Sequence, residues 1–108
     1  MTDMTNLGRF YINGAWVAPG PGAGTMPVID PSTETAFADV ALGTAADADA
    51  AILAARAAFM GWTSTAFAAR LALMHRIRDS YAARQDEIAA AISQEMGAAL
   101  SFAIEAQA

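Results

Sequence analysis

The chain has 108 residues, which is enough for one small domain. The chain has six Arg, no Lys and eleven Asp and Glu. The resulting net charge of −5 disfavours nucleic acid and anionic membrane surfaces as partners. The absence of Cys excludes a disulfide, a thiolate metal site and a Cys nucleophile within these residues.

The hydrophobic fraction of 56% overstates the core, because twenty-nine of those residues are Ala. An Ala side chain buries little apolar area, so we expect a thin core and a chain that is marginally stable alone. The first residues lack the basic and apolar regions of a signal peptide, and no apolar run reaches the ~18 residues of a membrane span. We therefore expect a soluble, cytoplasmic protein that does not contact a membrane.

The first third of the chain is predicted to be extended. Residues 1–8 are polar and predict a disordered tail. Asn13-Gly14 separates the apolar runs 10–12 and 15–17, which predicts a hairpin with a type I′ turn, because both central residues need positive φ. Residues 19–27 hold three of the four Pro and three Gly, and are expected to form a loop.

A second extended pair should follow. Pro31 biases the preceding residue away from helix, so 26–30 is expected to be a strand and 31–35 a turn. Residues 36–42 then predict another strand, and Gly43 ends the β region.

Helices are expected over the rest of the chain. Thr44 is a suitable N-cap for a helix over 45–60, and Asp47 is favourable in its first turn. Ile52, Ala55 and Phe59 recur at i, i+3 and i+7, which predicts the buried face. Gly61 suits the C′ position that follows this helix.

Two further helices are predicted over 66–82 and 84–96, the first capped from 63–65 and the second ended by Gly97. Ser101 is expected to cap a fourth helix, which the chain end cuts at residue 108. No βαβ unit is complete in this order of elements, so a closed parallel sheet cannot be assembled from these residues alone.

The motifs, in this order and spacing, resemble the N-terminal segment of the aldehyde dehydrogenase superfamily. The resemblance runs from about residue 9 to the last residue, with Asp30 where the family usually has Asn, Glu34 where Gly is common, and Ala98-Ala99 where Lys-Pro is frequent. The matching segments are Phe10-Tyr11-Ile12-Asn13-Gly14-Ala15-Trp16-Val17, Val28-Ile29-Asp30-Pro31-Ser32-Thr33-Glu34, Ala54-Ala55-Arg56-Ala57-Ala58-Phe59 with Trp62, Arg70-Leu71-Ala72-Leu73-Met74, and Glu95-Met96-Gly97.

The resemblance implies an α/β parent fold with a Rossmann-type cofactor domain, of which residues 1–108 would be an incomplete N-terminal part: a hairpin and strand followed by three to four Ala-rich helices. It implies a parent enzyme that oxidises an aldehyde to a carboxylic acid with NAD or NADP, and that forms a homodimer or homotetramer. The family's Cys nucleophile, Glu base and dinucleotide-binding residues come later in the chain, so the fragment is expected to be inactive and to hold no catalytic or cofactor-binding residue.

The resemblance also implies one metal site. Several family members bind a monovalent cation, Na or K, through backbone carbonyls near the Asn-Pro turn and an acidic residue at the third helix corner. The matching positions are Val28, Ile29 and Glu95. Oxygen ligands suit a hard cation.

Other residues that suggest chemistry have structural explanations that are preferred. Gly20 to Gly24 lacks the Lys-Ser/Thr ending of a P-loop and a following helix, so a connector is expected. His75 has no Cys beside it and is expected to be solvated or capping. Asp47 and Asp49 lie at a helix start, where capping is preferred to a metal pair. The Arg residues between 70 and 84 have acidic residues nearby in the sequence and are expected to form a mixed solvated face rather than an anion site. If one of them has a special role, Arg70 is the candidate, and that role would be pairing between helices.

A rival interpretation is a complete small Ala-rich module that mediates protein contacts without catalysis. A module should bury its own core and melt cooperatively, whereas a fragment should leave apolar side chains such as Phe102 and Ile104 exposed.

Overall fold

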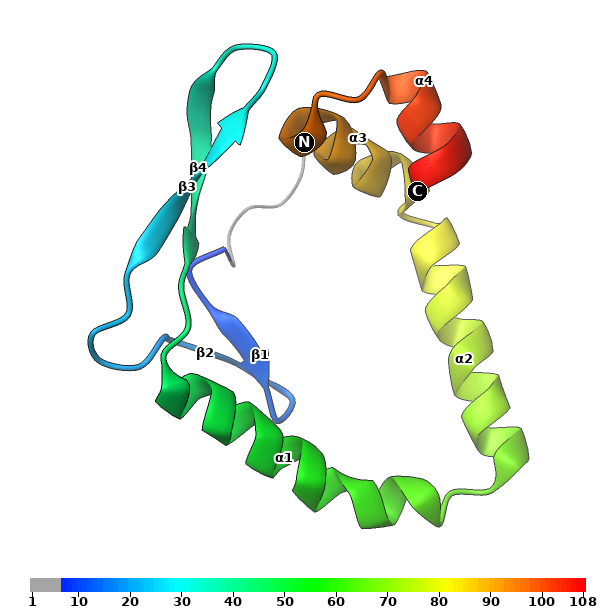
Figure 1. The fold of residues 1–108 in the computed structure, drawn as a ribbon. Coiled ribbons are helices and arrows are strands. Elements are labelled where there is room, and N and C mark those ends of the chain that lie inside the picture. Colours follow the sequence, from blue (N-terminus) through cyan, green and yellow to red (C-terminus); the bar gives the residue numbers. More distant parts are fainter. Residues whose placement is uncertain (1–6) are drawn as a thin grey trace. The chain divides into compact units, whose positions relative to one another are not determined.

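The computed structural model describes residues 7–108. Four short strands precede the helices, as expected (Figure 1). The described residues form two compact units: residues 7–29 with Ala36–Thr63, called here the α1 unit, and Asp30–Thr35 with Ser64–Ala108, called the α3 unit.

The α1 unit opens with the predicted hairpin. Strands β1 (Phe10–Ile12) and β2 (Ala15–Val17) are antiparallel, and the innermost pair is Ile12 with Ala15. Asn13 and Gly14 have φ of 51° and 78°, so both turn residues are left-handed, as a type I′ turn requires. The type I′ prediction is confirmed.

Strands β3 (Thr25–Asp30) and β4 (Thr35–Ala41) form the second two-stranded sheet. β3 begins slightly earlier than predicted and includes Pro27, which a two-stranded sheet tolerates because both strands are edges. The end of β4 is tied back by backbone bonds, from Ala41 N to Leu7 O at 2.9 Å and from Leu42 N to Gly24 O at 2.9 Å. Of the predicted tail 1–8, residues 1–6 lie outside the described residues.

Helix α1 (Ala45–Thr63) is longer than predicted, and the expected C′ role of Gly61 is wrong, because Gly61 lies inside the helix. Thr63 Oγ1 donates to Met60 O at 3.1 Å and so satisfies a carbonyl of the last turn. The predicted buried face is not covered by the described residues: Ile52 is 64% exposed and Phe59 48%.

The α3 unit contains α2 (Phe67–Ala82) and α3 (Gln85–Met96). The N-cap of α2 is Ala66, whose side chain makes no capping hydrogen bond, so the N-cap lies one residue after the predicted cap region 63–65. Gly97 ends α3 at a φ of 70°, as predicted, and its N–H donates to Ser93 O at 2.9 Å.

The chain closes with α4 (Leu100–Phe102) and the π-helical turn η1 (Ala103–Gln107), which pack on α3. The N-cap of α4 is Ala99. Ser101 therefore lies within the helix, and the prediction that Ser101 caps it is wrong. The fully buried apolar side chains among the described residues are Ala89 of α3 and Ala103 of η1. This core is as thin as the composition predicted, and Phe102 is 55% exposed, as expected of a fragment.

None of the helices in residues 7–108 is both long enough and apolar enough to cross a membrane.

Candidate functional site

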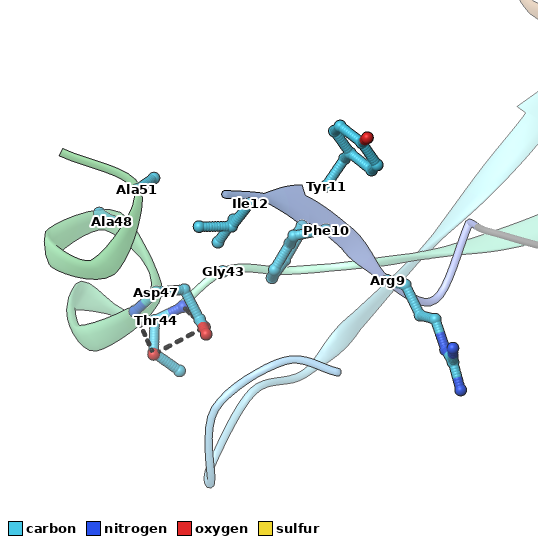
Figure 2. A pocket seen from close by; sticks show the side chains of 9 residues that line it. All are labelled: Arg9, Phe10, Tyr11, Ile12, Gly43, Thr44, Asp47, Ala48 and Ala51. Carbon is cyan, nitrogen blue, oxygen red and sulfur yellow. Dashed lines mark hydrogen bonds between the residues drawn. The ribbon is translucent and has the colours of Figure 1, made fainter. Parts of the chain in front are cut away.

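A pocket of about 540 Å³ lies in the α1 unit, between β1 and the start of α1 (Figure 2). Its walls are mostly apolar, and Asp47 and Thr44 supply the polar groups at the helix start. Arg9 belongs to the lining but extends away from the Asp47 carboxylate (Figure 2). The lining residues are Arg9, Phe10, Tyr11, Ile12, Gly43, Thr44, Asp47, Ala48 and Ala51.

Thr44 and Asp47 form a reciprocal helix cap. The Asp47 N–H donates to Thr44 Oγ1 at 3.3 Å, while the Thr44 N–H donates back to Asp47 Oδ2 at 2.8 Å. The Thr44 hydroxyl also donates to Oδ2 at 2.8 Å. This is the capping-box arrangement with Asp in the third helical position, so the predicted cap is confirmed.

Gly20 completes the set of donors around this carboxylate. Its backbone N–H lies 2.9 Å from Asp47 Oδ1 and 3.1 Å from Oδ2. The Thr44 N–H, then the Thr44 hydroxyl and the Gly20 N–H favour the charged form, and they hold the pKa of Asp47 below its ordinary value despite partial burial.

The arrangement acts structurally. Both oxygens of Asp47 accept hydrogen bonds from the chain itself, and the helix start that would attract an anion already holds this carboxylate. No group of three or more His, Cys, Asp or Glu in residues 7–108 is placed to hold a metal ion. The capping interpretation of Asp47 therefore stands, and the glycine-rich segment 20–24 is a connector into β3.

A second corner joins two of the sequence motifs within the α3 unit. The turn after Asp30 lies against the end of α3, where a Cβ added to Gly97 would stand 3.3 Å from Pro31 Cβ. Asp30 holds the turn through Ser32, whose N–H donates to its Oδ1 at 2.8 Å and whose hydroxyl donates to the same atom. These bonds, the hydroxyl first, hold the pKa of Asp30 below its ordinary value.

The predicted cation ligands are divided between the two units. Val28 and Ile29 lie on β3 in the α1 unit, while Glu95 lies in the last turn of α3, two residues before Gly97. The cation site stays a prediction.

The remaining candidate residues lie on helix surfaces. His75 is exposed on α2, in keeping with the solvated interpretation. The described Arg side chains in ion pairs are Arg78 with Asp79 at 2.7 Å and Arg84 with Glu87 at 2.7 Å, both local in sequence. These local, exposed pairs agree with the predicted mixed solvated face, and the candidate role of Arg70, an ion pair between helices, is not found within residues 7–108.

The sequence contains no signal for two of the long-range hydrogen bonds. Gly20 belongs to a predicted connector, and no local pattern links it to Asp47, 27 residues away. Gln85 caps the far end of the last helix, with Nε2 3.2 Å from Ile104 O and 3.3 Å from Ala108 O.

Comparison with known proteins decides the family. The profile of the aldehyde dehydrogenase family matches residues 16–107. The chain belongs to this family. The matched residues include most of the motifs described above, among them the Asp30 turn, the end of α1 and the Gly97 corner.

Individual members of the family match almost the whole of this chain. A 3-succinoylsemialdehyde-pyridine dehydrogenase from a Pseudomonas species is 43% identical over 97 residues, which are 90% of this chain and 20% of the relative. A solved mutant of aldehyde dehydrogenase C from Pseudomonas syringae, complexed with NAD+ and octanal, has a TM-score of 0.91 and 44% identity. That match covers 99% of this chain and 22% of the other.

An aldehyde dehydrogenase from Bartonella henselae has a TM-score of 0.88 and 44% identity over 92% of this chain and 21% of its own. The chain thus spans about a fifth of the length of the family members that it matches. The predicted fold class, a fragment of an aldehyde dehydrogenase-like α/β fold, is confirmed.

Proposed function

We propose that this chain is the N-terminal part of an NAD(P)-dependent aldehyde dehydrogenase that oxidises an aldehyde to a carboxylic acid, and that its own role is structural. The observation that carries the proposal is the match at 44% identity and a TM-score of 0.91 to a protein solved with NAD+ and octanal. The chain contains no Cys, so a thiolate nucleophile has to come from residues outside it.

The described residues do not fit a dinucleotide. A phosphate-binding turn runs from a strand through several Gly into a helix start, but 20–24 leads into β3. The strand-to-helix connection at 42–44 has one Gly, and its helix start binds the Asp47 carboxylate. We therefore assign NAD or NADP to residues outside this chain and derive no step through it.

The cation site remains part of the proposal. Glu95 places a carboxylate in the last turn of α3, where no basic residue lies, and negative charge is unfavourable at that end of a helix. A Na or K ion held by Glu95 and the carbonyls of Val28 and Ile29 would relieve this charge. In the full-length enzyme, Glu95→Gln should abolish the difference in activity between Na and K salts. An unchanged response to both salts contradicts the site.

A segment exchange tests the proposed function. This chain would replace the matching fifth of the Pseudomonas syringae enzyme, and NADH formation from octanal would be measured. The matched control is the same exchange with the Bartonella henselae segment, because this chain has the same 44% identity to both enzymes. We expect both exchanged enzymes to fold and to oxidise octanal.

An insoluble or inactive enzyme with this chain, beside an active control, contradicts the proposal. The 108-residue chain alone should form no NADH, and formation of NADH by it would contradict the assignment of the chemistry to residues outside this chain.

A cytoplasmic location and a homodimeric or homotetrameric parent are proposed on the family resemblance. The alternative of a self-contained interaction module has no support in residues 7–108, where the fully buried apolar side chains are two Ala.

A further inference from the structure

We propose that Asp47 acts as a clasp between loop 18–24 and the first turn of α1, so that the loop and the helix start open and close together. The inference does not depend on the enzymatic activity of the parent. It rests on one carboxylate that serves two segments distant in sequence, because Gly20 lies 27 residues before Asp47.

The two segments share the same acceptor atoms. Asp47 Oδ2 accepts the Thr44 N–H at 2.8 Å, the Thr44 hydroxyl at 2.8 Å and the Gly20 N–H at 3.1 Å. A carboxylate that turns to keep one donor loses its alignment with the others. Release of the loop therefore weakens the cap, and fraying of the cap releases the loop.

Loop 18–24 is anchored in its middle at this point. The bond from Ala23 N to Gly20 O, 3.2 Å, is internal to the loop, and the bond from Leu42 N to Gly24 O, 2.9 Å, holds its far end to the end of β4. Gly20 is thus the residue through which the centre of the loop is attached to α1.

The clasp leaves no space for a side chain at Gly20. A Cβ there would stand 2.9 Å from Thr44 Oγ1 and 3.3 Å from Asp47 Oδ1. Gly20 is not among the glycines with positive φ, so Gly20→Ala changes the space and not the allowed backbone region. Gly24→Ala is the matched control, because among the described residues its Cβ would meet only Leu42 Cδ1, at an ordinary 3.9 Å.

Amide hydrogen exchange in the full-length enzyme tests the coupling. The amides of Gly20, Thr44 and Asp47 should be protected in the unsubstituted enzyme. Gly20→Ala should speed exchange at Thr44 and Asp47 by about fivefold or more, the factor that a helix cap contributes. Gly24→Ala should change the exchange rates of the Thr44 and Asp47 amides by no more than about twofold, which is the effect of a surface substitution.

The reciprocal variant tests the opposite direction. Thr44→Val removes the hydroxyl and should speed exchange at Gly20 by a similar factor, although residue 44 lies far along the chain. Unchanged Thr44 and Asp47 amides in Gly20→Ala overturn the proposal, as does an unchanged Gly20 amide in Thr44→Val. So does an unsubstituted enzyme in which these three amides exchange like those of an unstructured peptide.

Discussion

Gly97→Ala is the substitution for which the structure makes the sharpest prediction. Gly97 ends α3 at a φ of 70°, a region that costs an L-residue free energy, and a Cβ added there would stand against the Pro31 ring. Gly61 provides a matched comparison, because it lies inside α1 and a Cβ there would meet nothing within 4 Å among residues 7–108. The same chemical change is therefore expected to have opposite effects at the two positions.

The magnitude at Gly97 follows from three contributions. The left-handed backbone costs an Ala about 1–2 kcal/mol. The new Cβ would stand 3.3 Å from Pro31 Cβ and 3.4 Å from Cγ, so the ring must shift, at roughly 1 kcal/mol, the low end for overpacking. The lower entropy of the unfolded Ala chain returns about 0.4–1 kcal/mol. We expect a net destabilisation of about 2 kcal/mol.

At Gly61 the same substitution should stabilise by about 0.5–1 kcal/mol, because Ala is the better helix former. Urea unfolding of the full-length enzyme, followed by helical circular dichroism, measures both changes. Gly97→Ala should lower the unfolding midpoint and Gly61→Ala should raise it. Midpoints that move in the same direction would refute the conformational reasoning, and an unchanged midpoint for Gly97→Ala would contradict the combined cost of the left-handed backbone and the contact with Pro31.

Three further changes are predicted. Glu34 has a φ of 57°, so Glu34→Gly should raise the free energy of unfolding by about 0.5 kcal/mol in the same urea assay, and a loss would contradict a left-handed Glu34. Ala89 is fully buried, so Ala89→Leu should cost about 1–3 kcal/mol by thermal melting, whereas the exposed Ala90→Leu should stay within about 0.5 kcal/mol. The folded pKa of Asp47 is lowered, so its stabilising effect is complete above the unfolded pKa of about 3.9 and is lost as pH falls through the folded value. The stability difference between the unsubstituted chain and Asp47→Asn should therefore shrink in acid titrations over that range, and a constant difference would contradict the lowered pKa.

Local signals in the sequence predicted the local structure well. Asn13-Gly14, the Thr44 cap and the Gly97 terminator each act through the conformation of one or two residues, and all three are confirmed. The errors occurred where a local signal was weak. Gly61 and Ser101 are residue types typical of helix ends, but in both places the helix continues through the residue.

The candidate site was predicted only in part. The hydrogen bonds between Thr44 and Asp47 join residues three apart and can be predicted from the sequence. The hydrogen bond from Gly20 to Asp47 joins residues 27 apart. No residue pattern encodes that contact, because it depends on the path of the loop after β2. The Pro31–Gly97 contact has no signal in the sequence for the same reason, although each of the two motifs can be recognised separately.

By itself the sequence determined the order of the elements, the thin Ala-rich core and the aldehyde dehydrogenase family, because composition, turn residues and motif spacing are properties of the chain alone. The tertiary structure decided which distant residues share a carboxylate and which Gly has no room for a side chain. It also decided that the apolar face of α1 is uncovered within the described residues, with Ile52 at 64% exposure. Burial requires a partner surface, and periodicity shows only which face would need one.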